Sequence, residues 1–152
     1  MNRPLPPAIG EVALVLTRVL LGVVMFAHGW QKMFIHGIGR TTEGFESLSI
    51  PMAIVSASFV TCVELAGSIL LILGAMTTVV CGLMLVIMAG AAWYVHIPHG
   101  IFVTQGGWEL VGVIAAGLLA LAAVGPGKYS IDHVIRKAQV ARERELELAG
   151  LR

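Results

Sequence analysis

Four ionisable side chains in apolar surroundings are the residues of this 152-residue sequence best suited to chemistry. His28 and Lys32 are one helical turn apart, so both would lie on the same face of a helix. His96 ends one apolar segment and Glu109 begins the next. Lysine and histidine can donate hydrogen bonds and a carboxylate can accept a proton, so the four could bind an anion or a quinone head group, or move protons.

Arg18 and Glu64 form a second polar set deeper in the apolar segments. With a rise of 1.5 Å per residue, Arg18 would lie about 9 Å from one end of its helix and Glu64 about 18 Å from the opposite end of the next. Those depths are nearly equal in a bilayer core about 30 Å thick, so we predict a structural Arg18–Glu64 ion pair. The same estimate predicts a Lys32–Glu109 pair near the outer surface, with His28 and His96 close by.

The composition indicates a membrane protein. The sequence is 57% hydrophobic and 12% charged, with a mean hydropathy of +0.88, whereas soluble domains are about 25% charged. Four segments, at about residues 12–35, 52–75, 77–97 and 107–124, have the length of about 20 residues that a bilayer-spanning helix needs. The sequence therefore predicts an all-α, four-transmembrane-helix bundle over residues 1–127, followed by a charged tail over residues 128–152. Residues 36–51 form the longest predicted loop.

Each predicted helix has a polar or small-residue face that should turn toward protein. On the first helix that face contains Arg18, Gly22, Met25, Gly29 and Lys32. On the second, Thr61, Gly67 and Ser68 surround Glu64. On the fourth, the small-residue seam comprises Gly112, Ala116, Ala120 and Ala123. This seam suits close packing, either within one bundle or between the two copies of a homodimer.

The tail combines an apolar face with mixed charges. Ile131, Val134, Ile135 and Ala138 would share one face of a helix that lies on the membrane surface or extends into solvent. Lysine and arginine are concentrated near the two termini, and Arg40 alone lies in a loop on the opposite side. Because cytoplasmic segments carry the excess of basic residues, we predict that both termini are cytoplasmic.

Other classes of site have little support. Cys62 and Cys81 lie in apolar segments and form no CxxC motif, so they are expected to be inert thiols. His96, His99 and Glu109 lack a recognised ligand spacing, so no metal site is predicted. The sequence has no basic stripe with interleaved aromatic residues, so no nucleic-acid partner is predicted. The intramembrane cations and carboxylates balance, so the polar set could also be a structural network that fixes the packing of the helices.

Four stretches together resemble the DoxX family of small bacterial membrane proteins. They are RVLLGVVMFAHGWQKMF, the glutamates of VELAGSILLILG and WELVGV, and the motif GPGKYSID. The resemblance covers residues 17–132 and is most distinctive in the His28-Gly29-x-x-Lys32 element and in residues 125–132.

The resemblance implies a four-helix bundle in the bacterial inner membrane and a role in redox or sulfur chemistry. A relative of the family is the large subunit of an archaeal thiosulfate:quinone oxidoreductase, and other members are linked to oxidative stress and thiol homeostasis. We therefore expect a membrane subunit of a redox or thiol-related complex, with quinone contacting a pocket of His28, Lys32, Glu109 and His96. The alternatives are a non-enzymatic scaffold or assembly factor with protein partners and, third, a small-solute or proton transporter.

Overall fold

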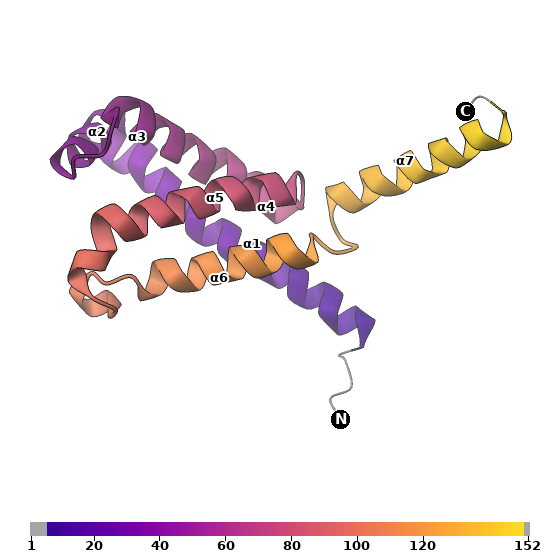
Figure 1. Cartoon of the computed structure of the whole chain (residues 1–152), viewed down its shortest axis with the longest axis horizontal. Helices are drawn as coiled ribbons and strands as arrows, with labels where there is room; N and C mark the ends of the chain where they lie inside the picture. The colour runs from indigo at the N-terminus through magenta and orange to yellow at the C-terminus, as the bar shows by residue number, and fades with distance from the viewer. Residues whose placement is uncertain (1–5, 151–152) are drawn as a thin grey trace.

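In the computed structural model, which describes residues 6–150, the chain is helical and contains no strand within that range (Figure 1). The first membrane segment consists of α1 (Pro7–Trp30), the π-helical turn η1 (Gln31–His36) and α2 (Gly37–Ser47). The second consists of α3 (Ala53–Cys62), the π-helical turn η2 (Val63–Gly67) and α4 (Ser68–Leu73).

The remaining elements complete the bundle and the tail. The third segment contains α5 (Thr77–Ala91), the π-helical turn η3 (Ala92–His96) and the 3-10 turn η4 (Ile97–His99). A second 3-10 turn, η5 (Val103–Gln105), leads into α6 (Glu109–Val124). The last helix is α7 (Ile131–Leu148).

Helix length and hydropathy confirm a helical membrane protein. Among the described residues, three continuous helices are long and apolar enough to cross a bilayer: Pro7–Ser47, Ala53–Leu73 and Thr77–His99. The fourth, α6, is apolar but has 16 residues, a length of about 24 Å. Large apolar side chains such as Leu20, Val86 and Val113 are exposed on the outer surface, where acyl chains would cover them.

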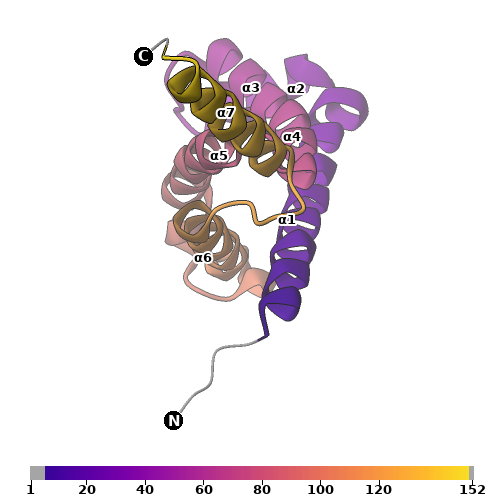
Figure 2. The same cartoon turned by 90° about the vertical axis from the view of Figure 1, so that its right-hand side faces the viewer.

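The four segments pack in chain order around a ring (Figure 2). α1 contacts η2 and α4 on one side and α6 on the other, while α5 contacts α4 and α6. Side chains from all four segments meet in the core, including Met25, Leu71, Met84 and Leu118. The packing places the predicted polar faces inside: Arg18, Gly22, Met25 and Gly29 are buried on α1, and Thr61, Glu64, Gly67 and Ser68 are buried on the second segment.

The predicted loop over residues 36–51 is wrong, because most of it forms α2. Gly37 has φ of +77° and permits a bend between η1 and the new helix. The hydroxyls of Thr41 and Thr42 donate to carbonyls one turn earlier, and α2 packs against α3. Tertiary contact thus overrides the weak helix propensity of this glycine-containing stretch.

The small-residue seam of α6 faces outward. Ala116, Ala120 and Ala123 are exposed, whereas Val111, Ile114, Leu118 and Leu121 are buried. Packing of the seam within the bundle is therefore a wrong prediction, because the larger side chains fill the core more completely. A homodimer through the exposed seam stays a prediction.

The tail helix α7 projects away from the bundle, at the end of the bundle where α1 also begins (Figure 1). The Ser130 hydroxyl accepts a hydrogen bond from the His133 backbone N–H at 3.2 Å, so Ser130 is the N-cap of α7. No residue of α7 is buried, and both Val134 and Ile135 are exposed. A membrane-surface or a solvated position for this helix stays a prediction.

Candidate functional site

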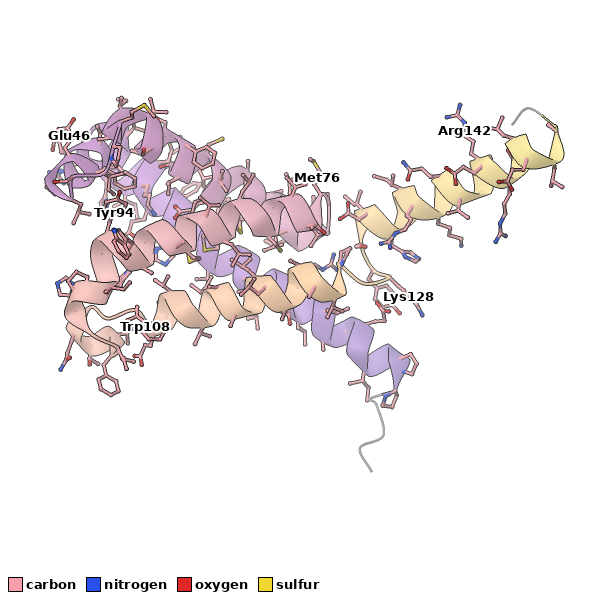
Figure 3. The ribbon with its side chains drawn as sticks, viewed as in Figure 1. Glu46, Met76, Tyr94, Trp108, Lys128 and Arg142 are labelled. Carbon is pink, nitrogen blue, oxygen red and sulfur yellow. The ribbon has the colours of Figure 1, made fainter. Side chains whose placement is uncertain are left out.

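A cavity of about 410 Å³ lies inside the ring, toward the end of the bundle opposite α7. Its walls are mainly apolar and come from all four membrane segments, as in most small-molecule sites. The ionisable and phenolic side chains in its lining are His28, Lys32, Glu64, Tyr94 and His96. Figure 3 shows Tyr94 and Trp108 at this end and Met76 and Lys128 at the other.

Lys32 and Glu64 form the polar centre of the cavity. Lys32 Nζ donates to Glu64 Oε2 at 2.7 Å and to Oε1 at 2.9 Å, which is the one ion pair within residues 6–150. The Glu64 side chain is 4% exposed and that of Lys32 is 21% exposed. The carboxylate is therefore withdrawn behind the lysine, and the ammonium group is the member of the pair that a ligand can reach.

This geometry contradicts both predicted ion pairs. Lys32, rather than Arg18, pairs with Glu64, and Glu109 contacts neither cation. The depth estimate assumed that the first helix begins near residue 12, but α1 begins at Pro7 and crosses its neighbours at an angle (Figure 1). Gly29 faces Glu64 and Leu65, which brings Lys32, one turn further along, beside the carboxylate.

All three π-helical turns of the described chain carry polar residues of the cavity. Lys32 lies in η1, Glu64 in η2, and Tyr94 and His96 in η3. A π-helical turn inserts an extra residue into an α-helix and occurs frequently at functional sites. Here the insertions arise in three different segments and meet at one cavity, which favours a shared role in shaping the site.

Side-chain hydrogen bonds support the distorted turns. The Thr41 hydroxyl lies 3.3 Å from the carbonyl oxygen of Lys32 and 3.0 Å from that of Gly37. The Ser68 hydroxyl donates to the Glu64 carbonyl. His96 Nδ1 lies 2.7 Å from the Gly106 carbonyl oxygen, which can only accept, so Nδ1 carries the proton. The neutral ring then keeps Nε2 as an acceptor.

Gly29 allows the two charged helices to approach closely. A Cβ atom at this position would lie 2.9 Å from Glu64 Cβ and 2.9 Å from the Leu65 backbone nitrogen. The backbone contact cannot be relieved by a side-chain rotation. The glycine of the His28-Gly29-x-x-Lys32 element therefore serves the packing that brings Lys32 to Glu64.

Of the predicted pocket residues, the structure brings His28, Lys32 and His96 together at the cavity, whereas Glu109 is not in its lining. Glu109 lies in the first turn of α6, where its Oε1 accepts a hydrogen bond from the Val103 backbone N–H at 2.7 Å. This hydrogen bond stabilises the loop that leads into α6. The prediction that Glu109 lines the pocket is therefore wrong.

Among the ionisable and phenolic side chains of the cavity, Glu64 and Tyr94 are the two that the sequence did not assign to this site. Glu64 was expected to pair with Arg18, and Tyr94 was not among the predicted site residues. Tyr94 follows Gly90 by one helical turn, but only the packing of the third segment shows that both residues line the cavity.

Arg18 belongs to a different structural unit, at the end of the bundle near α7. Its guanidinium is buried and donates from Nη2 to the Tyr129 carbonyl. Gly74, with φ of +66°, leaves room for this group, since a Cβ there would overlap Arg18 Nη1. Arg18 therefore anchors the segment that contains the GPGKYSID motif to the bundle.

Asp132 completes this anchor by capping a helix that is distant in sequence. Its Oδ1 accepts from the Met76 N–H at 2.7 Å and its Oδ2 from the Thr77 N–H at 2.9 Å, at the beginning of α5. Burial acts to raise the pKa of Asp132, but these backbone hydrogen bonds and nearby Arg136 outweigh it and hold the pKa below its ordinary value. Residues 125–132 are therefore structural in this fold.

Within the described range, no group of three or more acidic, histidine or cysteine side chains lies close enough to hold a metal ion. Cys62 is exposed and Cys81 is buried, and both are free thiols.

Comparison with known proteins gives a family. A family model described as DoxX matches residues 13–97, more than half of the chain. This match includes the buried face of α1, the Lys32–Glu64 pair and the three π-helical turns. No curated protein and no solved structure matches the chain. On the family match, the chain belongs to the DoxX family.

Proposed function

We propose that this DoxX protein binds a quinone in the cavity and serves as a membrane subunit of a redox or thiol-related complex. The observation that carries the proposal is the apolar cavity with the Lys32–Glu64 pair at its polar centre, where three π-helical turns meet. A quinone head group is a flat apolar ring with carbonyl oxygens, and it needs hydrogen-bond donors inside an apolar enclosure. The Lys32 ammonium group can supply one such donor.

The remaining polar side chains suit proton exchange with a bound quinone. Reduction to the quinol adds two electrons and two protons, and oxidation releases them. His96 offers an accepting Nε2, while His28 and the Tyr94 hydroxyl add groups that can donate or accept. In this proposal the chain binds the quinone and exchanges its protons, and a partner protein with a redox centre exchanges the electrons.

Binding of quinone to the purified protein in lipid nanodiscs tests the proposal. The variant is Lys32→Met combined with Glu64→Gln, because the double change removes the ammonium donor without leaving an unpaired carboxylate. We expect its affinity to fall by about tenfold or more, since a hydrogen bond to a charged group contributes about 1.5–3 kcal/mol. The control is Thr17→Val, a change at a half-buried position on α1 outside the cavity. Equal quinone affinity of the double variant, the control and the wild type would refute the proposal.

A second candidate function is a membrane scaffold or assembly factor. It is favoured by α7, which projects from the bundle with both charged and apolar side chains exposed (Figure 3). In this alternative residues 1–127 form the membrane domain and residues 128–152 recruit a partner. Truncation after Val140 keeps the Ser130 cap and the Asp132 contacts, so the bundle should stay folded. Retention of every co-purifying partner by the truncated protein would argue against the scaffold.

We also propose that both termini are in the cytoplasm of a bacterial cell, with the cavity in the outer half of the inner membrane. The support is the concentration of basic residues near both termini and their position at one end of the bundle. Impermeant thiol labelling of intact cells tests it, with Lys128→Cys and Glu46→Cys in a Cys62→Ala background. Labelling of position 46 alone agrees with the proposal, whereas labelling of position 128 alone would indicate the opposite orientation in the membrane.

A further inference from the structure

We infer that the cavity opens sideways to the lipid between α3 and α5, and that a bound quinone keeps its hydrocarbon tail in this opening. The inference rests on the proposed function and adds to it the class of ligand, a long-tailed quinone that enters from the bilayer. The opening is called the lateral portal below and is bordered by Ser56 and Phe59 on α3 and by Val86 and Gly90 on α5.

The packing of the second and third segments creates the lateral portal. In the described chain, α5 packs against η2 and α4 but not closely against α3. The two segments therefore diverge from the Ala75–Met76 turn toward the opposite end, as Figure 1 shows. By contrast, α5 packs against α6, and α1 packs against both α3 and α6.

Two portal residues line the cavity and are also exposed at the outer surface. Phe59 is 45% exposed and Val86 is 67% exposed. A side chain with both properties lies at an opening rather than in a closed wall. The four bordering residues carry no charge, so the opening is suited to a hydrocarbon chain.

The portal lies at the depth of the acyl chains. Phe59 is about 9 Å along its helix from the beginning of α3, and Val86 is about 14 Å from the beginning of α5 at the other end. Both positions fall within a hydrocarbon core about 30 Å thick. A molecule that passes between them would come from the lipid and not from water.

The size and polarity of the cavity determine which part of the ligand stays inside. A volume of about 410 Å³ is at the lower end of small-molecule sites, so it can hold a quinone head group but not a long prenyl tail. The head group would meet Lys32, and the tail would lie along Phe59 and Val86 toward the lipid. An amphiphile with this division between head and tail matches both the cavity and the portal.

The test compares two valine-to-tryptophan variants in nanodiscs. Val86→Trp narrows the portal, whereas Val113→Trp enlarges a lipid-facing side chain on α6 that does not line the cavity. The two valines are 67% and 70% exposed, so both substitutions should be tolerated equally by the fold. Equilibrium binding is measured with radiolabelled ubiquinone carrying its full prenyl tail and with its tail-less dimethoxy-methyl-benzoquinone head group.

We expect Val86→Trp to weaken binding of the long-tailed quinone by about tenfold, which corresponds to about 1.4 kcal/mol. Binding of the tail-less head group should stay within about twofold of the Val113→Trp protein, because the polar centre is unchanged. Equal binding of the long-tailed quinone by the two variants would overturn the portal, as would equal weakening of both quinones. If the wild type binds neither quinone, the proposed function itself fails.

Discussion

Substituting Lys32 alone, which leaves Glu64 without its partner, should destabilise the protein far more than removing both charges together. In Lys32→Met, the Glu64 side chain stays 4% exposed and loses both hydrogen bonds that it accepts from Lys32. Breaking a buried ion pair by removing one partner typically costs about 3–5 kcal/mol. Because the Lys32 side chain is 21% exposed, the pair is partly solvated and we expect a loss near the lower end, about 3 kcal/mol.

The reciprocal and double changes give the coupling between the two residues. Glu64→Gln should cost about 1–2 kcal/mol, since the lysine can still reach water in the cavity. The combination Lys32→Met with Glu64→Gln leaves no charge and should cost less than the two single changes added together. The difference, a coupling free energy of about 2–3 kcal/mol, measures the pair itself.

The assay is reversible unfolding in mixed micelles by titration with sodium dodecyl sulfate, which gives a free energy of unfolding for each variant. Arg18→Met provides the matched control, because Arg18 donates to the Tyr129 carbonyl and not to Glu64. Arg18→Met and Glu64→Gln should therefore be additive within about 0.5 kcal/mol. Additivity of Lys32→Met with Glu64→Gln, or strong coupling of the Arg18 control, would refute this pairing.

Three further outcomes follow from the packing. Gly29→Ala should destabilise the bundle by about 1–3 kcal/mol, because the added Cβ would lie 2.9 Å from Glu64 Cβ. Gly10→Ala is the control and should be tolerated, because its Cβ would have no neighbour within 4 Å. Equal unfolding free energies of the two variants would contradict this. Asp132→Ala should cost about 0.5–2 kcal/mol by uncapping α5, and an unchanged unfolding free energy would exclude that role. The folded-state pKa of Asp132 is lowered, so its contribution is complete above the unfolded-state pKa and is lost as pH falls through the folded-state pKa. The unfolding free energy of Asp132→Ala should therefore change less with pH in the acid range than that of the wild type. The same pH dependence in both proteins would show that another group causes the loss of stability in acid.

Properties that depend on one helix at a time could be predicted from the sequence. The apolar segments and the buried face of α1 follow from hydropathy and from the 3.6-residue period, which are local properties. His28, Lys32 and His96 were also predicted near one another, because the connection of the helices brings those positions to the same end of the bundle.

The ion pairs could not be predicted in the same way, because they depend on how two helices are offset along their axes. One helical turn is about 5.4 Å, so a small error in where α1 begins changes which carboxylate Lys32 meets. The close approach at Gly29 determines that offset, and it becomes visible only when both helices are in place.

Distortions and long-range caps were also beyond local sequence rules. A π-helical turn forms where tertiary packing compensates the extra residue, and η1, η2 and η3 have no distinctive composition. Ser130 caps its own helix, α7, whereas the Asp132 carboxylate caps the distant helix α5. Local rules identify a residue that can cap a helix without identifying which helix end it reaches.

The most direct test of quinone binding in the cavity is photo-cross-linking of the wild-type protein in nanodiscs. The probe is an azido-quinone, and peptide mass spectrometry locates the adducts. The proposal expects adducts on cavity residues of different segments, such as Met25, Tyr94 and Leu110, which excess unlabelled quinone should suppress. Adducts confined to lipid-facing positions such as Leu20 and Val113, with no effect of the competitor, would contradict a quinone site in this cavity.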